Sequence, residues 1–285
     1  MLLVLVAALV ACVLVCFVVL VPTCLGVDRV RSVVGDRRRL HRRLRAAAPF
    51  VGGLVVVLAI NKGLLDRTEA FAYQYGIEAT AWFHAVEEDL VGQLQTALPG
   101  WSLYYFGPIY VLGYAVLLTF PLVAYLFVDD PRALRTLVTS YAINYAVAVV
   151  CYTAVLAYGP RNYPADPVET DPASVTATTA AADQPLFNAF PAVTELTSQV
   201  NVHTNVFPSL HASLSLTVFM LAVSTRRELP RWTVVAGVLA ASVVVSTMYL
   251  GIHWAVDVIA GAGLAVGSVV AASRIVDRVH DGTGW

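Results

Sequence analysis

Charged side chains are scarce in this sequence. They make up 13% of its 285 residues, against about 25% in a typical water-soluble domain. Hydrophobic residues make up 58%, and the mean hydropathy is +0.72. The composition therefore excludes an ordinary soluble domain and predicts an integral membrane protein. The net charge of -1 gives no reason to expect a nucleic-acid partner.

Lysine and cysteine are scarce as well. Lys62 is the single lysine beside 17 arginines. The four cysteines lie in apolar runs and form no CxxC pair, which argues against both a zinc site and a disulfide framework. We predict neither a metal nor a cofactor. The cysteines are Cys12, Cys16, Cys24 and Cys151.

Long apolar runs are abundant. A membrane-spanning helix needs about 20 predominantly apolar residues. Seven runs come close to that length, at 2–26, 49–65, 102–128, 134–157, 208–224, 232–250 and 254–273. We therefore predict an all-α fold, and specifically a polytopic membrane helix bundle.

The basic residues between these runs alternate from one connecting segment to the next. Fifteen of the 18 lie in the segments 27–48, 129–135, 225–231 and 274–285, and the others are Lys62, Arg67 and Arg161. Basic loops are retained in the cytoplasm. The pattern therefore predicts a multi-pass protein of the cell membrane with its N-terminus outside and its C-terminus cytoplasmic. The segments that carry Arg161, His211 and His253 then all face outward.

Two further features concern packing. Residues 81–94 carry apolar side chains at mixed three- and four-residue spacing, which predicts one amphipathic helix at the membrane interface. Such a helix either covers the bundle or gives lipids access to it, and the sequence leaves both roles open. Gly263 and Gly267 have the small-xxx-small spacing that lets membrane helices pack closely.

Two polar clusters stand at the outward ends of the last three runs. In the first, Pro208 suits the first turn of a helix, and Ser209 lies at the same terminus. Free N–H groups and the positive end of the helix dipole form an anion-binding site there. His211 can donate to a phosphate oxygen or protonate a leaving alcohol, or it can serve only to cap the helix.

The second cluster contains His253 and Asp257, which share one helix face because they are four residues apart. A carboxylate bonded to one ring nitrogen leaves the other nitrogen directed as a nucleophile or base. If two of the runs form a hairpin, the histidines meet, and one can attack phosphorus while the other protonates the departing oxygen. Arg161, in an outer loop, can bind the phosphate oxygens through its guanidinium.

Residues 207–213 (FPSLHAS) and 248–257 (MYLGIHWAVD) resemble two signatures of the type 2 phosphatidic acid phosphatase superfamily, PSGH and SRxxxxxHxxxD. The likeness covers about 85–270. It is closest to the branch that includes fungal inositol phosphorylceramide synthase, with FPSLH and MYLxxHxxxD, and residues 87–117 also look like that branch.

This resemblance implies a six-helix phosphatase-like core, preceded here by one N-terminal transmembrane helix. It also implies metal-independent chemistry with His253 as the nucleophile, Asp257 orienting it and His211 assisting the leaving group. The first signature, KxxxxxxRP, is not matched: Arg161 follows a proline, and Ala154 replaces the lysine. Thr247 replaces the arginine of the third signature. The loss of two phosphate-binding cations suits the transferase-like branch better than the simple phosphatases.

The predicted organisation is an N-terminal transmembrane helix with a basic cytoplasmic segment (1–48), a catalytic membrane domain (49–274) with outer loops 66–101 and 158–206, and a cytoplasmic tail (275–285). The predicted activity is that of a lipid phosphate phosphatase or phosphotransferase on the outer membrane face, working through a phosphohistidine. Its substrate is expected to be a phospholipid or an isoprenoid-lipid phosphate.

Several alternatives stay open at this point. Water and an alcohol are both possible acceptors, and the lipid and the oligomeric state cannot be read. A histidine-lined transporter or channel without phosphate chemistry would need polar residues deep in the spans, where Asn144 is the notable one. A metal-dependent CDP-alcohol transferase would need a DxxDGxxAR cluster, which the sequence lacks. His203, close to His211, is a further candidate for lining the site.

Overall fold

Long helices make up most of the computed structural model, which describes residues 2–162 and 204–283. Six of these helices are long and apolar enough to cross a membrane, by length and composition. A shorter apolar helix, α11 (Leu210–Ser224), accompanies them. The predicted all-α membrane helix bundle is therefore confirmed. The six spans are Leu2–Leu25, Leu40–Leu64, Ser102–Ala124, Arg132–Ala154, Pro230–Tyr249 and Ala255–His280.

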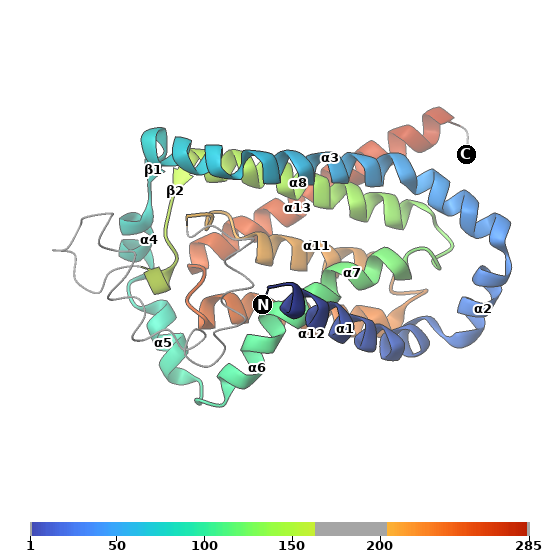
Figure 1. Ribbon diagram of the computed structural model, residues 1–285, viewed down its shortest axis with the longest axis horizontal. Coiled ribbons are helices and arrows are strands. Elements are labelled where there is room, and N and C mark those ends of the chain that lie inside the picture. The colour runs from blue at the N-terminus through green and yellow to red at the C-terminus, as the bar shows by residue number, and fades with distance from the viewer. Residues whose placement is uncertain (1, 163–203, 284–285) are drawn as a thin grey trace.

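The elements follow one another from end to end of the bundle. The first half contains α1 (Leu2–Leu20), the π-helix η1 (Val21–Leu25), α2 (Val27–Gly35), α3 (Arg37–Tyr75), β1 (Ile77–Glu78), α4 (Thr80–Glu87), α5 (Leu90–Ala97), α6 (Ser102–Pro108), the π-helix η2 (Ile109–Gly113) and α7 (Tyr114–Ala124). The second half contains α8 (Arg132–Ala154), β2 (Val155–Leu156), the 3-10 turn η3 (Pro160–Asn162), α11, α12 (Pro230–Tyr249) and α13 (Ala255–Thr283). Figure 1 shows α4 and α5 at one end of the bundle, with α2 and the C-terminus at the other.

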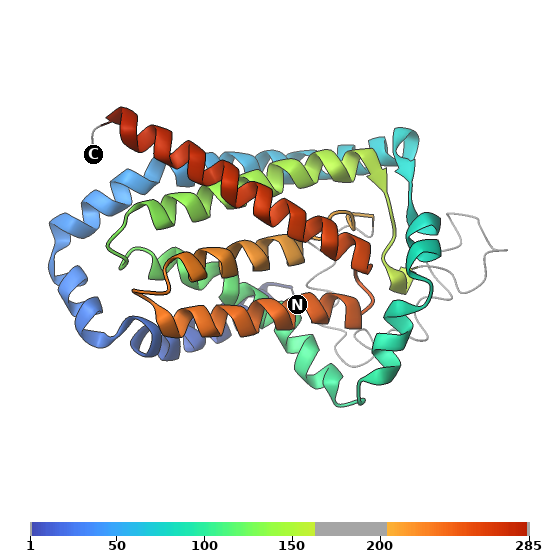
Figure 2. The same cartoon turned by 180° about the vertical axis from the view of Figure 1, so that it is seen from behind.

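Helix α11 lies inside the bundle, in contact with α7, α8, α12 and α13. Apolar and small residues occur on all its faces, as expected for a buried helix, and Leu214 and Val218 have no exposed surface. In α8, Asn144 donates to the Thr217 hydroxyl over 3.3 Å and accepts a hydrogen bond from the Ser213 hydroxyl. Figures 1 and 2 both show α11 beginning deeper in the bundle than the neighbouring ends of α8 and α12.

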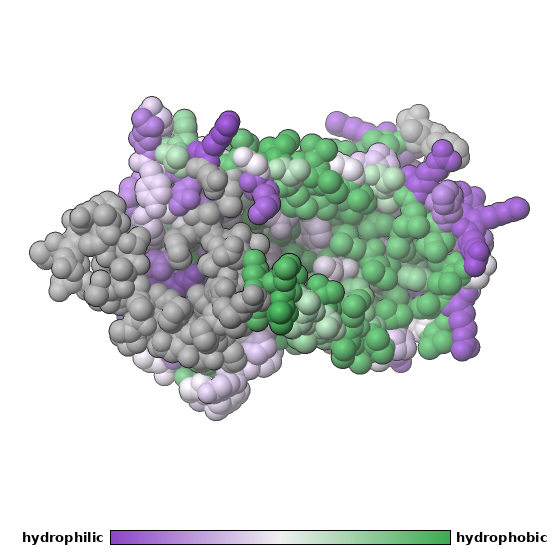
Figure 3. Space-filling model, viewed as in Figure 1, coloured by the Kyte–Doolittle hydropathy of each residue, from purple (hydrophilic) through white to green (hydrophobic). Residues whose placement is uncertain are grey.

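Apolar side chains also cover the outside of the bundle. Helix α1 has no buried residues, and its Leu3 and Val18 are 84% and 75% exposed. Figure 3 shows hydrophobic residues across the middle of the face it displays and hydrophilic residues at the end that carries α2. This distribution suits contact with lipid hydrocarbon around the middle of the bundle.

The helices around the polar segments differ from two expectations. Helix α3 is continuous from Arg37 to Tyr75 and passes through Pro49, so residues 37–48 of the basic segment expected before the second span form its first turns. The prediction of a single helix over 81–94 is wrong. Glu88 adopts a positive φ of 53°, which interrupts the helix and separates α4 from α5.

The prediction about Gly263 and Gly267 is also wrong. Among the described residues, nothing lies within 4 Å of the position that a Cβ would take at either glycine. Gly261 provides the close contact instead, because a Cβ there would lie 2.5 Å from the Ser209 carbonyl oxygen. The approach of α13 to α11 therefore depends on a glycine outside the small-xxx-small pair.

A short parallel strand pair ties two distant segments together. In it Ile77 faces Val155 and Glu78 faces Leu156, so the segment after α3 is joined to the end of α8. The Ala157 backbone then pairs with Asn205, which leads into α11. These contacts bring the η3 turn and the start of α11 to the same end of the bundle.

Candidate active site

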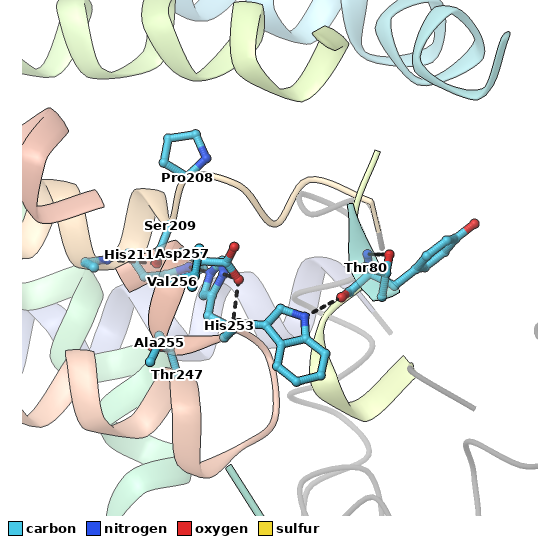
Figure 4. A network of polar contacts seen from close by, with 12 residues as sticks. Thr80, Pro208, Ser209, His211, Thr247, His253, Ala255, Val256 and Asp257 are labelled. Atoms are coloured by element: carbon cyan, nitrogen blue, oxygen red, sulfur yellow. Dashed lines mark hydrogen bonds and ion pairs between the residues drawn. The ribbon is translucent and has the colours of Figure 1, made fainter. Parts of the chain in front are cut away.

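The structure brings His211 and His253 into contact. His211 lies in the first turn of α11, and His253 lies in the short connection between α12 and α13. Nδ1 of His211 is 3.3 Å from Nε2 of His253, and the ring centroids are 5.5 Å apart. His253 is 2% exposed. Figure 4 shows the pair beside Asp257, where the starts of α11 and α13 meet.

Asp257 lies next to His253 without forming the hydrogen bond that the four-residue spacing led us to expect. Its Oδ2 is 3.6 Å from Nδ1 of His253. The same oxygen accepts a hydrogen bond of 2.8 Å from the Trp254 backbone N–H, which holds the carboxylate slightly away from the ring. Asp257 has no exposed surface. The carboxylate therefore lies within ion-pair range of the ring nitrogen that does not face His211.

The end of α12 fixes the position of His253. Gly251 has a φ of 65°, a left-handed conformation that suits glycine and commonly ends helices. The Thr247 carbonyl then accepts hydrogen bonds from the N–H groups of Ile252, at 2.9 Å, and His253, at 3.2 Å. These bonds hold the His253 backbone against the last turn of α12.

Carboxylates occupy the N-terminus of α13. Glu87, at the end of α4, accepts hydrogen bonds from the N–H groups of Ala255, at 2.9 Å, and Val256, at 2.5 Å. A helix N-terminus attracts negative charge, so Glu87 and Asp257 take the place that an anionic ligand would otherwise hold. Glu87 could not be identified from the sequence, because nothing in a sequence shows that residue 87 meets residues 255 and 256.

Ser209 caps α11. Its Oγ accepts a hydrogen bond of 3.2 Å from the Ala212 N–H, and its own N–H donates to the Asp257 carbonyl over 3.0 Å. Ser209 has no exposed surface. It therefore joins the starts of α11 and α13, and its contact with a phosphate stays a prediction.

Arg161 lies in η3, packed against the connection that carries His253. Its backbone N–H donates to the Gly251 carbonyl over 2.8 Å. A Cβ on Gly251 would lie 3.2 Å from the Arg161 Cβ, and a Cβ on Gly159 would lie 2.2 Å from the Ile252 carbonyl oxygen. Two glycines therefore let the η3 segment lie directly on the His253 connection.

Burial determines the charge states of His253 and Arg161. Burial and the nearby charge of Arg161 lower the pKa of His253, so the ring is neutral at physiological pH and retains a reactive lone pair. Burial also lowers the pKa of Arg161, but an arginine begins so high that it stays charged. A neutral imidazole beside a permanent cation is a suitable arrangement for attack on a phosphate.

Two tyrosines pack against His211. The ring centroids of Tyr110 and Tyr114 lie 4.9 Å and 4.8 Å from that of His211. Tyr110 belongs to η2, and π-helical turns are frequent at functional sites. Neither tyrosine could be identified from the sequence, because apolar periodicity does not reveal where a π-helical turn redirects a side chain.

The two signature positions that lack cations hold neutral residues. Ala154 ends α8, and Thr247 is fully buried in α12, with its hydroxyl donating to the Val244 carbonyl over 2.8 Å. Neither position brings a charge to the histidines. The remaining candidate, His203, lies outside the described residues.

A sequence model of the PAP2 superfamily matches residues 81–271, about two thirds of the chain. The chain therefore belongs to the PAP2 superfamily, and the matched range contains Arg161, both histidines and Asp257. Enzymes of this superfamily are metal-independent phosphatases and phosphotransferases. Membership implies a membrane phosphatase-like enzyme and favours this class over a histidine-lined transporter. Searches of curated proteins and of solved structures found no match.

Proposed function

We propose that this protein is a lipid phosphate phosphatase or phosphotransferase that forms a phosphohistidine on His253. The observation that carries the proposal is the 3.3 Å contact between Nε2 of His253 and Nδ1 of His211. Asp257 lies beside the other ring nitrogen of His253, which leaves Nε2 as the nitrogen that attacks phosphorus.

The reaction has two steps with the same participants. In the first, Nε2 of His253 forms a bond to phosphorus and the bond to the ester oxygen breaks. His211, in the protonated form that the bound phosphate anion stabilises, gives a proton to the departing alcohol. In the second, water or an alcohol attacks phosphorus and gives its proton to His211 while the bond to His253 breaks. Asp257 stabilises the positive charge that His253 gains, and Arg161 binds the phosphate oxygens.

Substrate binding must separate the two rings in this mechanism. A phosphorus atom bonded to Nε2, with an ester oxygen beyond it that accepts from His211, does not fit between nitrogens 3.3 Å apart. Tyr110 and Tyr114 flank the His211 ring. We expect these aromatic neighbours to guide the His211 ring as it turns to admit the phosphate.

The substrate, acceptor and orientation are further parts of the proposal. The fifteen basic residues in alternate connecting segments support a site on the outer membrane face, with the C-terminus in the cytoplasm. The FPSLH and MYLxxHxxxD motifs, together with the neutral Ala154 and Thr247, support a resemblance to the inositol phosphorylceramide synthase branch. The substrate is then a phospholipid or an isoprenoid-lipid phosphate, and an alcohol competes with water as the acceptor.

The decisive experiment is a phosphate-release assay on lipid phosphates with excess chelator. We expect wild-type protein to stay active and to carry an acid-labile phosphoryl label, whereas His253→Ala loses both. His41→Ala is the matched control, because His41 is an exposed histidine in the first turns of α3. A reversible loss of activity on chelation, or a label that survives in His253→Ala, contradicts the proposal. Adding an alcohol such as inositol and identifying the product distinguishes transfer from hydrolysis.

A further inference from the structure

The end of the bundle away from the histidines contains a second concentration of charge. Figure 1 shows the start of α3, the start of α8 and the end of α13 at this end of the bundle. A cavity of about 980 Å³ is lined by residues of these three helix ends and of the α7–α8 connection. Arg42, Arg43 and Arg45 of α3 and Arg135 of α8 contribute four guanidinium groups to it, against the single carboxylate of Asp129. None of these residues takes part in the proposed reaction.

Arg135 distinguishes this cavity from a solvated basic surface. The residue lines the cavity, yet it is only 8% exposed. Its guanidinium lies over the Phe50 ring, 5.8 Å from the centroid, and no carboxylate among the described residues pairs with it. A guanidinium carries five N–H donors, and no Arg135 nitrogen is among the fully buried polar atoms that lack a partner, so these donors are accessible from the cavity. Arg135 therefore calls for an anionic acceptor inside the cavity.

The neighbouring arginines add further positive charge to the cavity. Nη1 of Arg43 donates to the Leu126 carbonyl over 2.6 Å, and its Nη2 lies 3.7 Å from an Asp129 oxygen. The Asp129 side chain is 75% exposed, so solvent and salt screen that pair. Arg42 and Arg45 are exposed beside it. Four positive charges against one negative charge leave a positive potential that attracts an anion.

The cavity lies at the ends of three of the candidate membrane spans. Its three α3 arginines fall in the first two turns of the span that begins at Leu40, and Arg135 falls in the first turn of the span that begins at Arg132. Val279 lies at the end of the α13 span, which finishes at His280. Basic pockets between membrane helices at this depth are suited to anionic lipid headgroups.

The rest of the lining is apolar and is contributed by Ala46, Pro49, Phe50 and Val279. A free phosphate ion buries none of this surface, whereas the glycerol and acyl chains of a lipid do. We propose that the cavity binds the phosphate headgroup of an anionic phospholipid, with Arg135 as the buried contact and the apolar wall against the chains. This site is separate from the reaction at His253 and does not depend on it.

The test uses the full-length protein carrying His253→Ala, purified in a neutral detergent, so that no lipid is turned over. Native mass spectrometry measures retained phosphatidylglycerol, with phosphatidylcholine and inorganic phosphate added separately at equal concentration as comparisons. Of the three compounds, we expect only phosphatidylglycerol to be retained by the protein. We also expect only phosphatidylglycerol to raise the melting temperature. Arg135→Gln should weaken the binding of phosphatidylglycerol about tenfold or more, since one charge-assisted contact is lost.

A double variant, Arg42→Gln with Arg45→Gln, provides a second test in case Arg135→Gln does not fold. Arg42 and Arg45 are both exposed, so replacing them should not disturb folding. The double variant should weaken binding comparably. Arg31→Gln is the matched control, an exposed arginine in α2 outside the cavity lining, and should leave binding unchanged. Undiminished binding in both cavity variants, or equal binding of phosphatidylcholine, overturns the proposal. A thermal shift with inorganic phosphate equal to that with phosphatidylglycerol assigns the cavity to a free anion and overturns the lipid assignment.

Discussion

The Glu87 carboxylate accepts a hydrogen bond of 2.5 Å from the Val256 backbone N–H, across 169 positions of sequence. With the second bond, from Ala255, this contact fixes the first turn of α13 next to His253. Glu87 belongs to α4, outside the long spans. A peripheral helix therefore helps to position the connection that carries His253 without touching either histidine in the contacts described.

We predict that Glu87→Ala lowers kcat about 10- to 100-fold and changes KM little, because a displaced nucleophile reacts more slowly in an otherwise intact site. Glu87→Gln keeps one acceptor oxygen and should lie between Glu87→Ala and wild type. Steady-state kinetics on a lipid phosphate measure both constants. Glu88→Gln removes an adjacent exposed carboxylate and should behave as wild type. Equal losses in the Glu87 and Glu88 variants would contradict a positioning role.

His211→Ala should lose activity in a way that depends on the leaving group. General acid catalysis contributes about 10²- to 10⁴-fold, and it matters most when the departing alcohol is a poor leaving group. We predict a large loss on an alkyl phosphate and a much smaller one on an aryl phosphate such as p-nitrophenyl phosphate. His253→Ala should be inactive on both substrates. A His211→Ala defect of equal size on both substrates would show that His211 does not protonate the leaving group.

Activity should persist at pH values where an ordinary histidine is already protonated. Burial and the Arg161 charge lower the pKa of His253 from its usual 6.5, so the nucleophile keeps its lone pair as the pH falls through that value. Arg161→Gln removes a cation, which raises the pKa of His253 and should move the acidic limb of the kcat/KM profile to higher pH. Comparing the variant with wild type on one substrate cancels the ionisation of the substrate. An unmoved acidic limb would mean that Arg161 does not act on His253.

The same lowered pKa makes stability depend on pH. Between the folded and unfolded pKa values of His253, the unfolded chain binds a proton that the folded protein does not. The contribution of the neutral His253 ring to the free energy of unfolding is therefore fully present above the unfolded pKa of 6.5. This contribution decreases as the pH falls below that value. Melting temperatures in detergent at pH 7.5, 6.5 and 5.5 measure this, and His253→Gln should reduce the dependence. His41→Ala, which changes an exposed histidine, should leave it as in wild type.

Gly261→Ala and Gly263→Ala form a matched pair on one helix. A Cβ on Gly261 meets the Ser209 carbonyl oxygen at 2.5 Å, whereas among the described residues nothing lies within 4 Å of a Cβ on Gly263. We expect Gly261→Ala to destabilise the protein by about 1–3 kcal/mol through overpacking and to reduce activity by shifting α11. Gly263→Ala should be neutral or slightly stabilising, since alanine is the better helix former. Melting temperature and phosphate release measure both effects, and equal behaviour of the two variants would show that Gly261 does not set the helix spacing.

The sequence predicted what depends on local spacing and composition. The spans followed from apolar length, and the meeting of His211 with His253 followed from two short motifs at the ends of one helical hairpin. Contacts between segments that no hairpin joins could not be predicted in the same way. The small-xxx-small spacing of Gly263 and Gly267 says that a residue is small, but not which helix faces it. Glu87 lacked a signal for the same reason, since its partners are backbone N–H groups in another part of the chain.

We expect the shortness of α11 to affect how long the phosphohistidine proposed on His253 lasts. Its 15 residues rise about 22 Å, less than the roughly 30 Å of hydrocarbon in a bilayer. Its first turn therefore stays below the ends of α8 and α12, as Figures 1 and 2 show. A phosphoryl group on His253 would lie at this depth, so we expect its lifetime to depend on which hydroxyl compounds can reach the start of α11.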